Sequence, residues 1–128
     1  KQKTAYEIFE AAQEAAVSNK SASFAVRGVG AVRMVQLADI KYVESVKHYL
    51  FFHTAGEELK MRGTLGEIKP LFKANGFAEI NRSLLVNLAY VEGYTLSEIT
   101  VGGEALPLSR VYKAEFLDAL TSFIGRKN

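Results

Sequence analysis

The chain of 128 residues contains no cysteine. This absence excludes disulfide frameworks, thiol catalysis, Fe–S clusters and cysteine-type zinc sites. Long apolar runs are also missing, because no stretch approaches the roughly 18 residues that a membrane span needs. The first residues lack the apolar core of a signal peptide. We therefore expect no membrane association and a cytoplasmic location, with which the lack of cysteine is compatible.

An excess of either charge is missing as well. The 16 basic and 14 acidic residues give a net charge of +2, and the isoelectric point is about 8.8. This balance is compatible with nucleic-acid binding but does not argue for it. The hydrophobic content of 48% and charged content of 23% are typical of a globular domain and exclude disordered or collagen-like chains. The length suits one domain with a short appendage.

The first part of the chain has the pattern of an amphipathic helix. Thr4 and Glu7 form a capping box at the expected start, and residues 18–21 form a polar break after it. The chain opens with Lys1 and not with methionine. We expect residues 1–22 to be a linker helix that precedes a domain of residues 23–128. The apolar stripe of the expected helix 4–18 consists of Ala5, Ile8, Phe9, Ala12 and Ala16.

After residue 22 the apolar residues alternate with a period of two, which is typical of β-strands. Gly28-Val29-Gly30 and Gly102-Gly103 predict hairpin turns. A short helix over 64–74 contains Pro70 and is expected to be short, bent or late-starting, with Leu71 on its buried face. The prediction is a mainly β domain of antiparallel strands with short helices. The expected strands are 23–27, 32–37, 40–46, 48–54, 59–62, 77–80, 84–88, 92–96, 98–101 and 105–108.

The last helix is expected over 110–124, with Ser109 as its N-cap. Its predicted buried stripe is Tyr112, Phe116, Leu120, Phe123 and Ile124.

Groups that would carry catalysis or bind a metal are sparse. His48 and His53 are an odd number of residues apart, so on one strand they would face opposite sides and could not bind one metal ion. No cluster of acidic residues suits Mg²⁺, and no G-x-S-x-G motif accompanies a serine. We therefore predict no catalytic residues, no metal and no cofactor. A small hydrolase with an unrecognised acid pair stays as a minor alternative.

Two polar segments stand beside strongly apolar strands. Asn81-Arg82-Ser83 directly precedes the apolar strand 84–88, and Ser109-Arg110 lies between a strand and the last helix. Helix starts favour anions, and a guanidinium group binds phosphate or guanine in a bidentate way. A single arginine of this kind ordinarily forms a surface salt bridge. Two such sites, together with Lys47-His48, favour nucleic-acid binding instead.

The sequence resembles LytTR-type DNA-binding domains, the output modules of a class of bacterial response regulators. The resemblance covers residues 24–120 and implies an elongated sandwich of small antiparallel sheets whose loops enter DNA major grooves. It rests on FAVRGVGAVRMVQLADIKYVESVKHYLFFHT, TLGEIKPLF, GFAEINRSLLVNLAYV and ALPLSRVYKAEFL.

The resemblance also implies DNA-contacting residues. His48, Arg82 and Arg110 are the expected main contacts, although Asn81 stands where many members have histidine. Asn87 is expected to serve a turn or a backbone bond instead. The other expected contacts are Lys47, Tyr49, Asn81, Ser83, Ser109 and Lys113, with Lys41 and Arg126 as further cations that touch the DNA backbone.

Finally, the resemblance implies that residues 1–22 join this domain to a receiver domain. Double-stranded DNA with paired repeat sites would be the partner, and the output would be transcription control in a two-component system. Dimerisation would come from the receiver or from DNA, so this fragment is expected to be monomeric. A membrane-linked or stand-alone parent protein stays possible. The alternative function is a β module that binds another protein without touching DNA.

Overall fold

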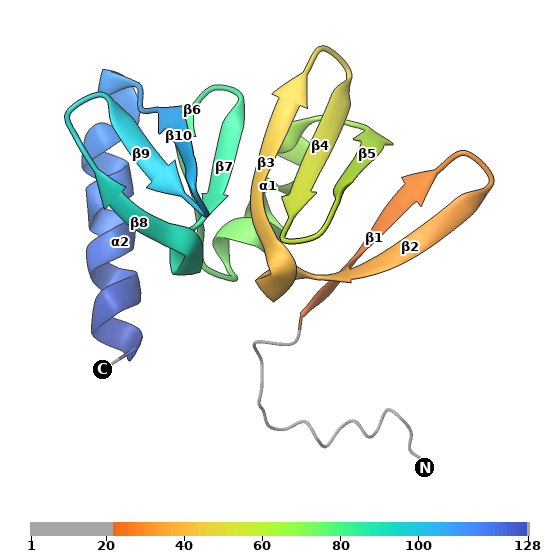
Figure 1. Ribbon diagram of the computed structural model, residues 1–128, viewed down its shortest axis with the longest axis horizontal. Coiled ribbons are helices and arrows are strands. Elements are labelled where there is room, and N and C mark those ends of the chain that lie inside the picture. The colour runs from red at the N-terminus through yellow and green to blue at the C-terminus, as the bar shows by residue number, and fades with distance from the viewer. Residues whose placement is uncertain (1–21, 128) are drawn as a thin grey trace.

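The computed structural model describes residues 22–127 (Figure 1). The helix predicted over 4–18 lies outside the described residues. The remainder is mainly β, as predicted, with its strands arranged in three small antiparallel sheets. The molecule is elongated, with the sheets side by side along its long axis (Figure 1).

The central sheet has five strands in the order β5-β4-β3-β7-β6. Leu84, Leu85 and Val86 on β7 are all at least 95% buried, which confirms that this strand is covered on both faces. The strands are β3 (Ile40–Val46), β4 (Tyr49–Thr54), β5 (Glu58–Arg62), β6 (Phe77–Asn81) and β7 (Leu84–Asn87).

One face of this sheet is covered by helix α1 (Leu65–Lys73) and by a ribbon of strands β1 (Ser23–Gly28) and β2 (Ala31–Gln36). Phenylalanine rings fill the space between them. The ring of Phe72 on α1 packs edge-on against Phe24 and Phe77, with centroids 5.3 and 4.8 Å apart. Such burial is the main driving force for this half of the fold.

Helix α1 begins with the predicted capping box and contains Pro70. The backbone N–H of Thr64 donates to Glu67 Oε1 at 3.0 Å. The prediction that Leu71 lies on the buried face is wrong, because Leu71 is 41% exposed. The buried stripe is Leu65, Ile68 and Phe72, and the residue before Phe72 is turned about 100° away from it.

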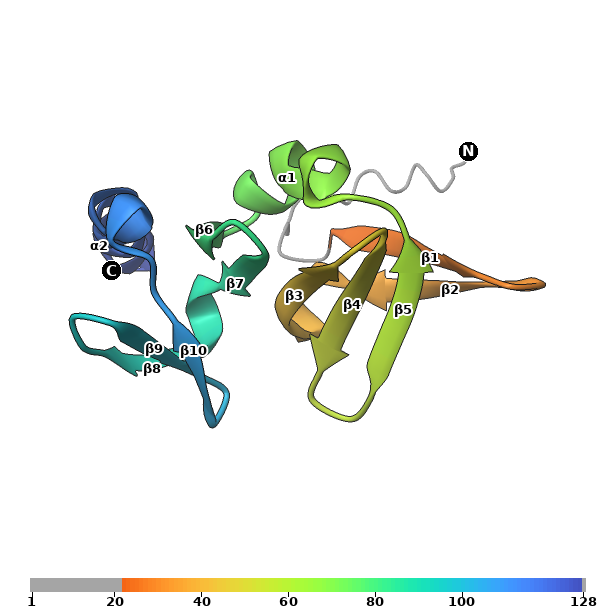
Figure 2. The ribbon, with the colours of Figure 1, turned by 90° about the horizontal axis from the view of Figure 1, so that it is seen from above.

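The other face is covered over only half of its width. A second sheet in the order β10-β9-β8 and helix α2 pack on β6 and β7, so that Ile80 and Val86 meet Ile99 and Phe116 (Figure 2). Within residues 22–127, the same face of β4 and β5 has no such cover. The covering elements are β8 (Val91–Tyr94), β9 (Glu98–Val101), β10 (Glu104–Pro107) and α2 (Lys113–Lys127).

Two predicted boundaries change because of local turns. The strand expected over 92–96 ends at Tyr94, since Thr95 Oγ1 accepts hydrogen bonds from the backbone of Ser97 and Glu98 and makes a turn. The strand expected from 48 begins at Tyr49 because Lys47 has a φ of 58° and turns the chain. The predicted Gly102-Gly103 hairpin turn is confirmed, with φ values of 54° and 89°.

The end of the chain also differs from the prediction. A 3₁₀ turn over Arg110–Tyr112 precedes α2, and Ser109 makes no side-chain capping bond. The predicted N-cap is therefore wrong, since a tight turn separates this residue from the α-helix. Ile124 was expected on the buried stripe and is exposed, because that stripe ends at Phe123.

Candidate nucleic-acid interface

Three polar segments that are far apart in sequence lie along one edge of the molecule. They are residues 47–49 at the β3–β4 turn, 81–83 at the β6–β7 turn, and 109–110 between β10 and α2, and together they form what we call the loop edge. All of them lie at the top of Figure 1. The fold thus brings together the segments that carry His48, Arg82 and Arg110.

Hydrogen bonds fix these segments to one another. The backbone N–H of Ser45 donates to the carbonyl of Ser83 at 2.8 Å, which ties the first two turns together. The backbone N–H of Ser109 donates to the carbonyl of Ile80, also at 2.8 Å, which ties the second to the third. The relative positions of the segments are therefore set by the sheet and not by flexible loops.

Asn81 is the side chain that joins two of the segments. Its Nδ2 donates to the carbonyl of Pro107 at 2.8 Å, and its Oδ1 accepts from the backbone N–H of Ser83 at 2.8 Å and from the Ser83 hydroxyl at 3.2 Å. Asn81 thus shapes the turn that presents Arg82. Its predicted contact with DNA, and that of Ser83, stay predictions.

The cations of the loop edge have no acidic partner in the part of the chain that the structure describes. Lys47, Arg82 and Arg110 are exposed, and within residues 22–127 none of them forms an ion pair with a carboxylate. Lys113, half-buried at the start of α2, has none either. Arg33 on the ribbon, by contrast, is paired with Glu57. Unpaired guanidinium groups keep all their donors available for an anionic partner.

Lys47 holds a strained backbone conformation. Within residues 22–127 it is the one non-glycine residue with positive φ, at 58°. The two-residue turn between Val46 and Tyr49 requires this conformation, which glycine or asparagine adopts more easily. The cost for an L-residue is about 1–2 kcal/mol. Strain of this kind, held by the surrounding sheet, is typical of functional segments.

Tyr49 lies beside two cations that the sequence analysis missed. Lys60 Nζ is 4.5 Å and Arg62 Cζ is 5.9 Å from the centroid of the Tyr49 ring. Both lie on β5, where Arg62 is paired directly opposite Tyr49. The predicted turn at 55–57 would pair Lys60 with Phe52, whereas the structure pairs Lys60 with Phe51. No register predicted from the sequence would therefore have placed these cations beside Tyr49.

Three other predicted residues lie elsewhere. Lys41 Nζ donates to the carbonyl of Gly102 at 3.5 Å, so this lysine is not on the loop edge. Arg126 lies near the end of α2 that points away from the loop edge (Figure 1). The backbone role predicted for Asn87 is confirmed, since its Nδ2 donates to the carbonyl of Ile40 at 2.9 Å and its Oδ1 accepts from Ala89 N–H at 3.0 Å.

The histidines do not share a site. His48 belongs to the turn, whereas the ring of His53 stacks on Tyr42 with centroids 4.2 Å apart and lies 3.6 Å from Glu44. Within residues 22–127, no three His, Asp or Glu residues gather into a set that would hold a metal ion. No helix in the same range is long and apolar enough to cross a membrane.

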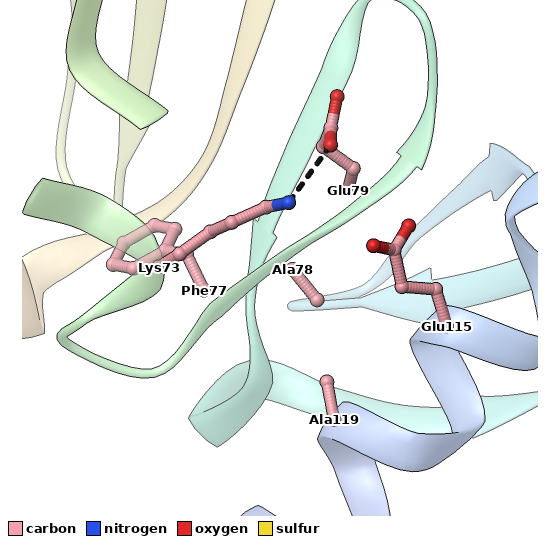
Figure 3. A pocket seen from close by; sticks show the side chains of 6 residues that line it. All are labelled: Lys73, Phe77, Ala78, Glu79, Glu115 and Ala119. Carbon is pink, nitrogen blue, oxygen red and sulfur yellow. Dashed lines mark ion pairs between the residues drawn. The ribbon is translucent and has the colours of Figure 1, made fainter. Parts of the chain in front are cut away.

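A hollow between α1, β6 and α2 contains the buried carboxylate Glu79 (Figure 3). Glu79 accepts from Lys69 Nζ at 2.8 Å and from Lys73 Nζ at 3.0 Å. Burial alone raises the pKa of Glu79, but the hydrogen bonds from the two lysines outweigh it and lower the pKa. The two ion pairs join α1 to β6, so this carboxylate contributes to the packing of the helix on the sheet.

The fold is that of a known class of DNA-binding β domain. The structure matches a solved LytTr DNA-binding domain of a protein from Bacillus cereus described as a methyl-accepting/DNA response regulator, with a TM-score of 0.66 and 19% identity. The match covers 77% of this chain and 95% of that one.

The sequence comparisons agree with the structural one. The chain is 28% identical over 107 residues to the sensory transduction protein LytT of Enterococcus faecalis (strain ATCC 700802 / V583). This match covers 79% of the chain but only 44% of the relative, so the chain spans less than half of its length. Residues 30–121 match the family described as the LytTr DNA-binding domain. The chain belongs to this family and is a DNA-binding domain.

Proposed function

We propose that the domain binds double-stranded DNA in a sequence-specific manner through its loop edge. The observation that carries this proposal is the row of exposed, unpaired cations on short turns that are hydrogen-bonded to one another. Base reading requires donors held at fixed spacing, because the pattern of acceptors in the major groove is itself fixed.

Each residue has a stated role in this proposal. Arg82 and Arg110 donate to base edges, with guanine as the preferred partner of a guanidinium group, and His48 assists them. Asn81 holds Arg82 in place through its bond to Pro107. The remaining residues, Lys47, Tyr49, Ser83, Ser109 and Lys113, contact or approach the phosphates and set the register on the duplex.

The descriptions of the relatives support a biological role for the domain. One is named a sensory transduction protein and another is described as a response regulator. We infer that this domain is the output part of a longer bacterial two-component regulator and that it controls transcription. Residues 1–22 would then link it to a receiver, and two copies would occupy repeats about one helical turn apart on one face of the DNA.

The first test is selection from a randomised duplex library at low salt. Wild type should enrich a short motif, whereas the Arg82→Ala/Arg110→Ala double variant should enrich none. On the selected motif, each single variant should lose about 1–3 kcal/mol of binding free energy. Arg27→Ala removes an exposed cation on β1, away from the loop edge, and should bind within about twofold of wild type.

Two outcomes would overturn the proposal. One is a wild-type domain that enriches no motif even when fused to a dimerising partner. The other is a selected motif that the double variant binds as tightly as wild type does. The first result would favour a module that binds protein, and the second would place the DNA site elsewhere on the domain.

A further inference from the structure

The uncovered half of the central sheet presents two cations over aromatic rings. Cross-strand pairs place Tyr49 opposite Arg62 and Phe51 opposite Lys60, so the four side chains share one face. This is the face that β8–β10 and α2 cover only over β6 and β7. Lys60 and Arg62 are exposed, and the Tyr49 ring is 36% exposed.

The rings hold the cations in position. Lys60 Nζ lies 4.5 Å from the Tyr49 centroid and 5.9 Å from that of Phe51, and Arg62 Cζ lies 5.9 Å from Tyr49. A cation over an aromatic face keeps its charge and its outward donors while losing side-chain freedom. Less ordering entropy is then lost when an anion binds.

Two acidic residues of β3 and β5 share this face, and Glu44 is paired opposite Phe51. Glu44 lies 3.6 Å from His53, and Glu58 is paired opposite His53, two residues beyond Lys60. Within residues 22–127, neither Lys60 nor Arg62 forms an ion pair. Two like charges are thus held beside one ring, neither of them in an ion pair within residues 22–127, and a bound anion would relieve their mutual repulsion.

The patch is continuous with the loop edge. Arg62 is the last residue of β5, and the next residue, Gly63, donates its backbone N–H to the carbonyl of His48 at 2.9 Å. In Figure 2 the strands β7, β3, β4 and β5 follow one another away from α2. Arg62 therefore lies past His48, at the end of the row that begins with Arg110.

We propose that Tyr49, Lys60 and Arg62 form a preformed phosphate-binding site that extends the loop edge to a flanking segment of the DNA. This proposal rests on the proposed function. Lys60 and Arg62 contact backbone phosphates of the flank, and Tyr49 is a positioning residue that acts through them. Since phosphates carry no sequence information, the site adds affinity for all sequences alike.

The test is DNA affinity as a function of salt concentration, measured on the selected motif and on random duplex. The association constant falls as salt rises, and Lys60→Ala and Arg62→Ala should each make the slope of log K against log salt less steep by about 0.9. Each substitution should also weaken binding about five- to tenfold at 0.1 M salt. Both losses should be equal on the two duplexes. Arg27→Ala is the matched control, because it removes one exposed positive charge elsewhere.

Tyr49 variants separate positioning from general stability. Tyr49→Phe retains the ring and removes only the hydroxyl, so it should weaken binding less than Tyr49→Thr, which retains a β-branched strand former without the ring. Thermal unfolding of each variant shows whether the fold is retained. If Tyr49→Phe loses as much affinity as Tyr49→Thr, the ring is not the positioning group.

Shortening the duplex gives a second, independent readout. We shorten the duplex by removing the base pairs that flank the motif on the side of His48. Wild type should then lose about as much affinity as the Lys60→Ala/Arg62→Ala substitutions cost on the full-length duplex. The double variant should lose no further affinity on the shortened duplex. Equal losses for both proteins would overturn the inference, as would a double variant with the salt slope of wild type. If Arg82→Ala and Arg110→Ala also bind DNA normally, the proposed function itself is wrong. If these two variants bind more weakly but the Lys60 and Arg62 variants bind normally, only the flanking site is wrong.

Discussion

The molecule contains two groups of cations that are used in opposite ways. Lys69 and Lys73 on α1 converge on the buried carboxylate of Glu79, and their ammonium groups stay only partly exposed. Arg82 and Arg110 stand on exposed turns with no carboxylate partner within residues 22–127. The first arrangement holds α1 against β6, and the second leaves charge available to another molecule.

From this difference we expect stability and DNA binding to depend on different cations of the domain. A paired cation contributes through the group it neutralises, so its loss leaves a buried charge uncompensated. An exposed, unpaired cation contributes little to folding, so its loss changes stability by less than about 0.5 kcal/mol. Substitutions in the first group should therefore change unfolding, and those in the second should change DNA affinity.

The largest stability effect is expected from Lys69→Ala/Lys73→Ala. Removal of both lysines leaves the Glu79 carboxylate buried without a donor and should destabilise the fold by about 2 kcal/mol. Urea unfolding measures this loss. A triple variant that also carries Glu79→Leu should recover part of it, because no buried charge remains. If the folded Lys69→Ala/Lys73→Ala variant also loses DNA affinity, these two lysines contribute to binding as well as to stability.

A smaller loss of stability is expected when the pH is lowered. The lysines lower the pKa of Glu79 in the folded state, despite the opposing effect of burial. As the pH falls, the Glu79 carboxylate is therefore protonated at a higher pH in the unfolded chain than in the folded one. The stability that the two lysines give to the ionised carboxylate is present above the ordinary pKa of glutamate and is lost as the pH falls below it. Unfolding at a series of pH values measures this, and Glu79→Gln should flatten that part of the profile. If the stability of Glu79→Gln falls with decreasing pH as steeply as that of wild type, other groups cause the loss of stability in acid.

The smallest effect is expected from Lys47→Gly, which should stabilise the fold slightly and weaken DNA binding. Glycine removes the cost of positive φ but adds chain entropy to the unfolded state, so the fold should gain about 0.5 kcal/mol. The lost charge should lower the salt slope of DNA binding by about 1. Thermal unfolding and a salt titration test both. A less stable Lys47→Gly protein would show that the turn is not strained.

Local signals explain what the sequence alone could predict. Short hairpins are specified by adjacent turn residues, so the Gly102-Gly103 turn and its two strands were predicted from a few neighbouring positions. The capping box at Thr64 and Glu67 is equally local. Arg82 was found because it stands one residue before a strongly apolar strand, and Arg110 because it lies between a strand and the start of the last helix.

What the sequence could not show is which parts of a face stay uncovered. The strand 59–62 was predicted, but the exposure of Lys60 and Arg62 depends on where β8–β10 and α2 pack, which is a tertiary property. Lys41 was grouped with the DNA contacts because charge alone does not say at which end of a strand a residue lies. Its bond to Gly102 depends on a turn about 60 residues later in the chain.

The loop edge also determines how the domain can be joined to other proteins. The start of β1 and the end of α2 both lie on the opposite side of the molecule from the loop edge (Figure 1). If DNA binds at the loop edge, as proposed, the body of the domain would separate the duplex from a protein attached at either point. We therefore expect that a sensor fused at either point would not compete sterically with the DNA.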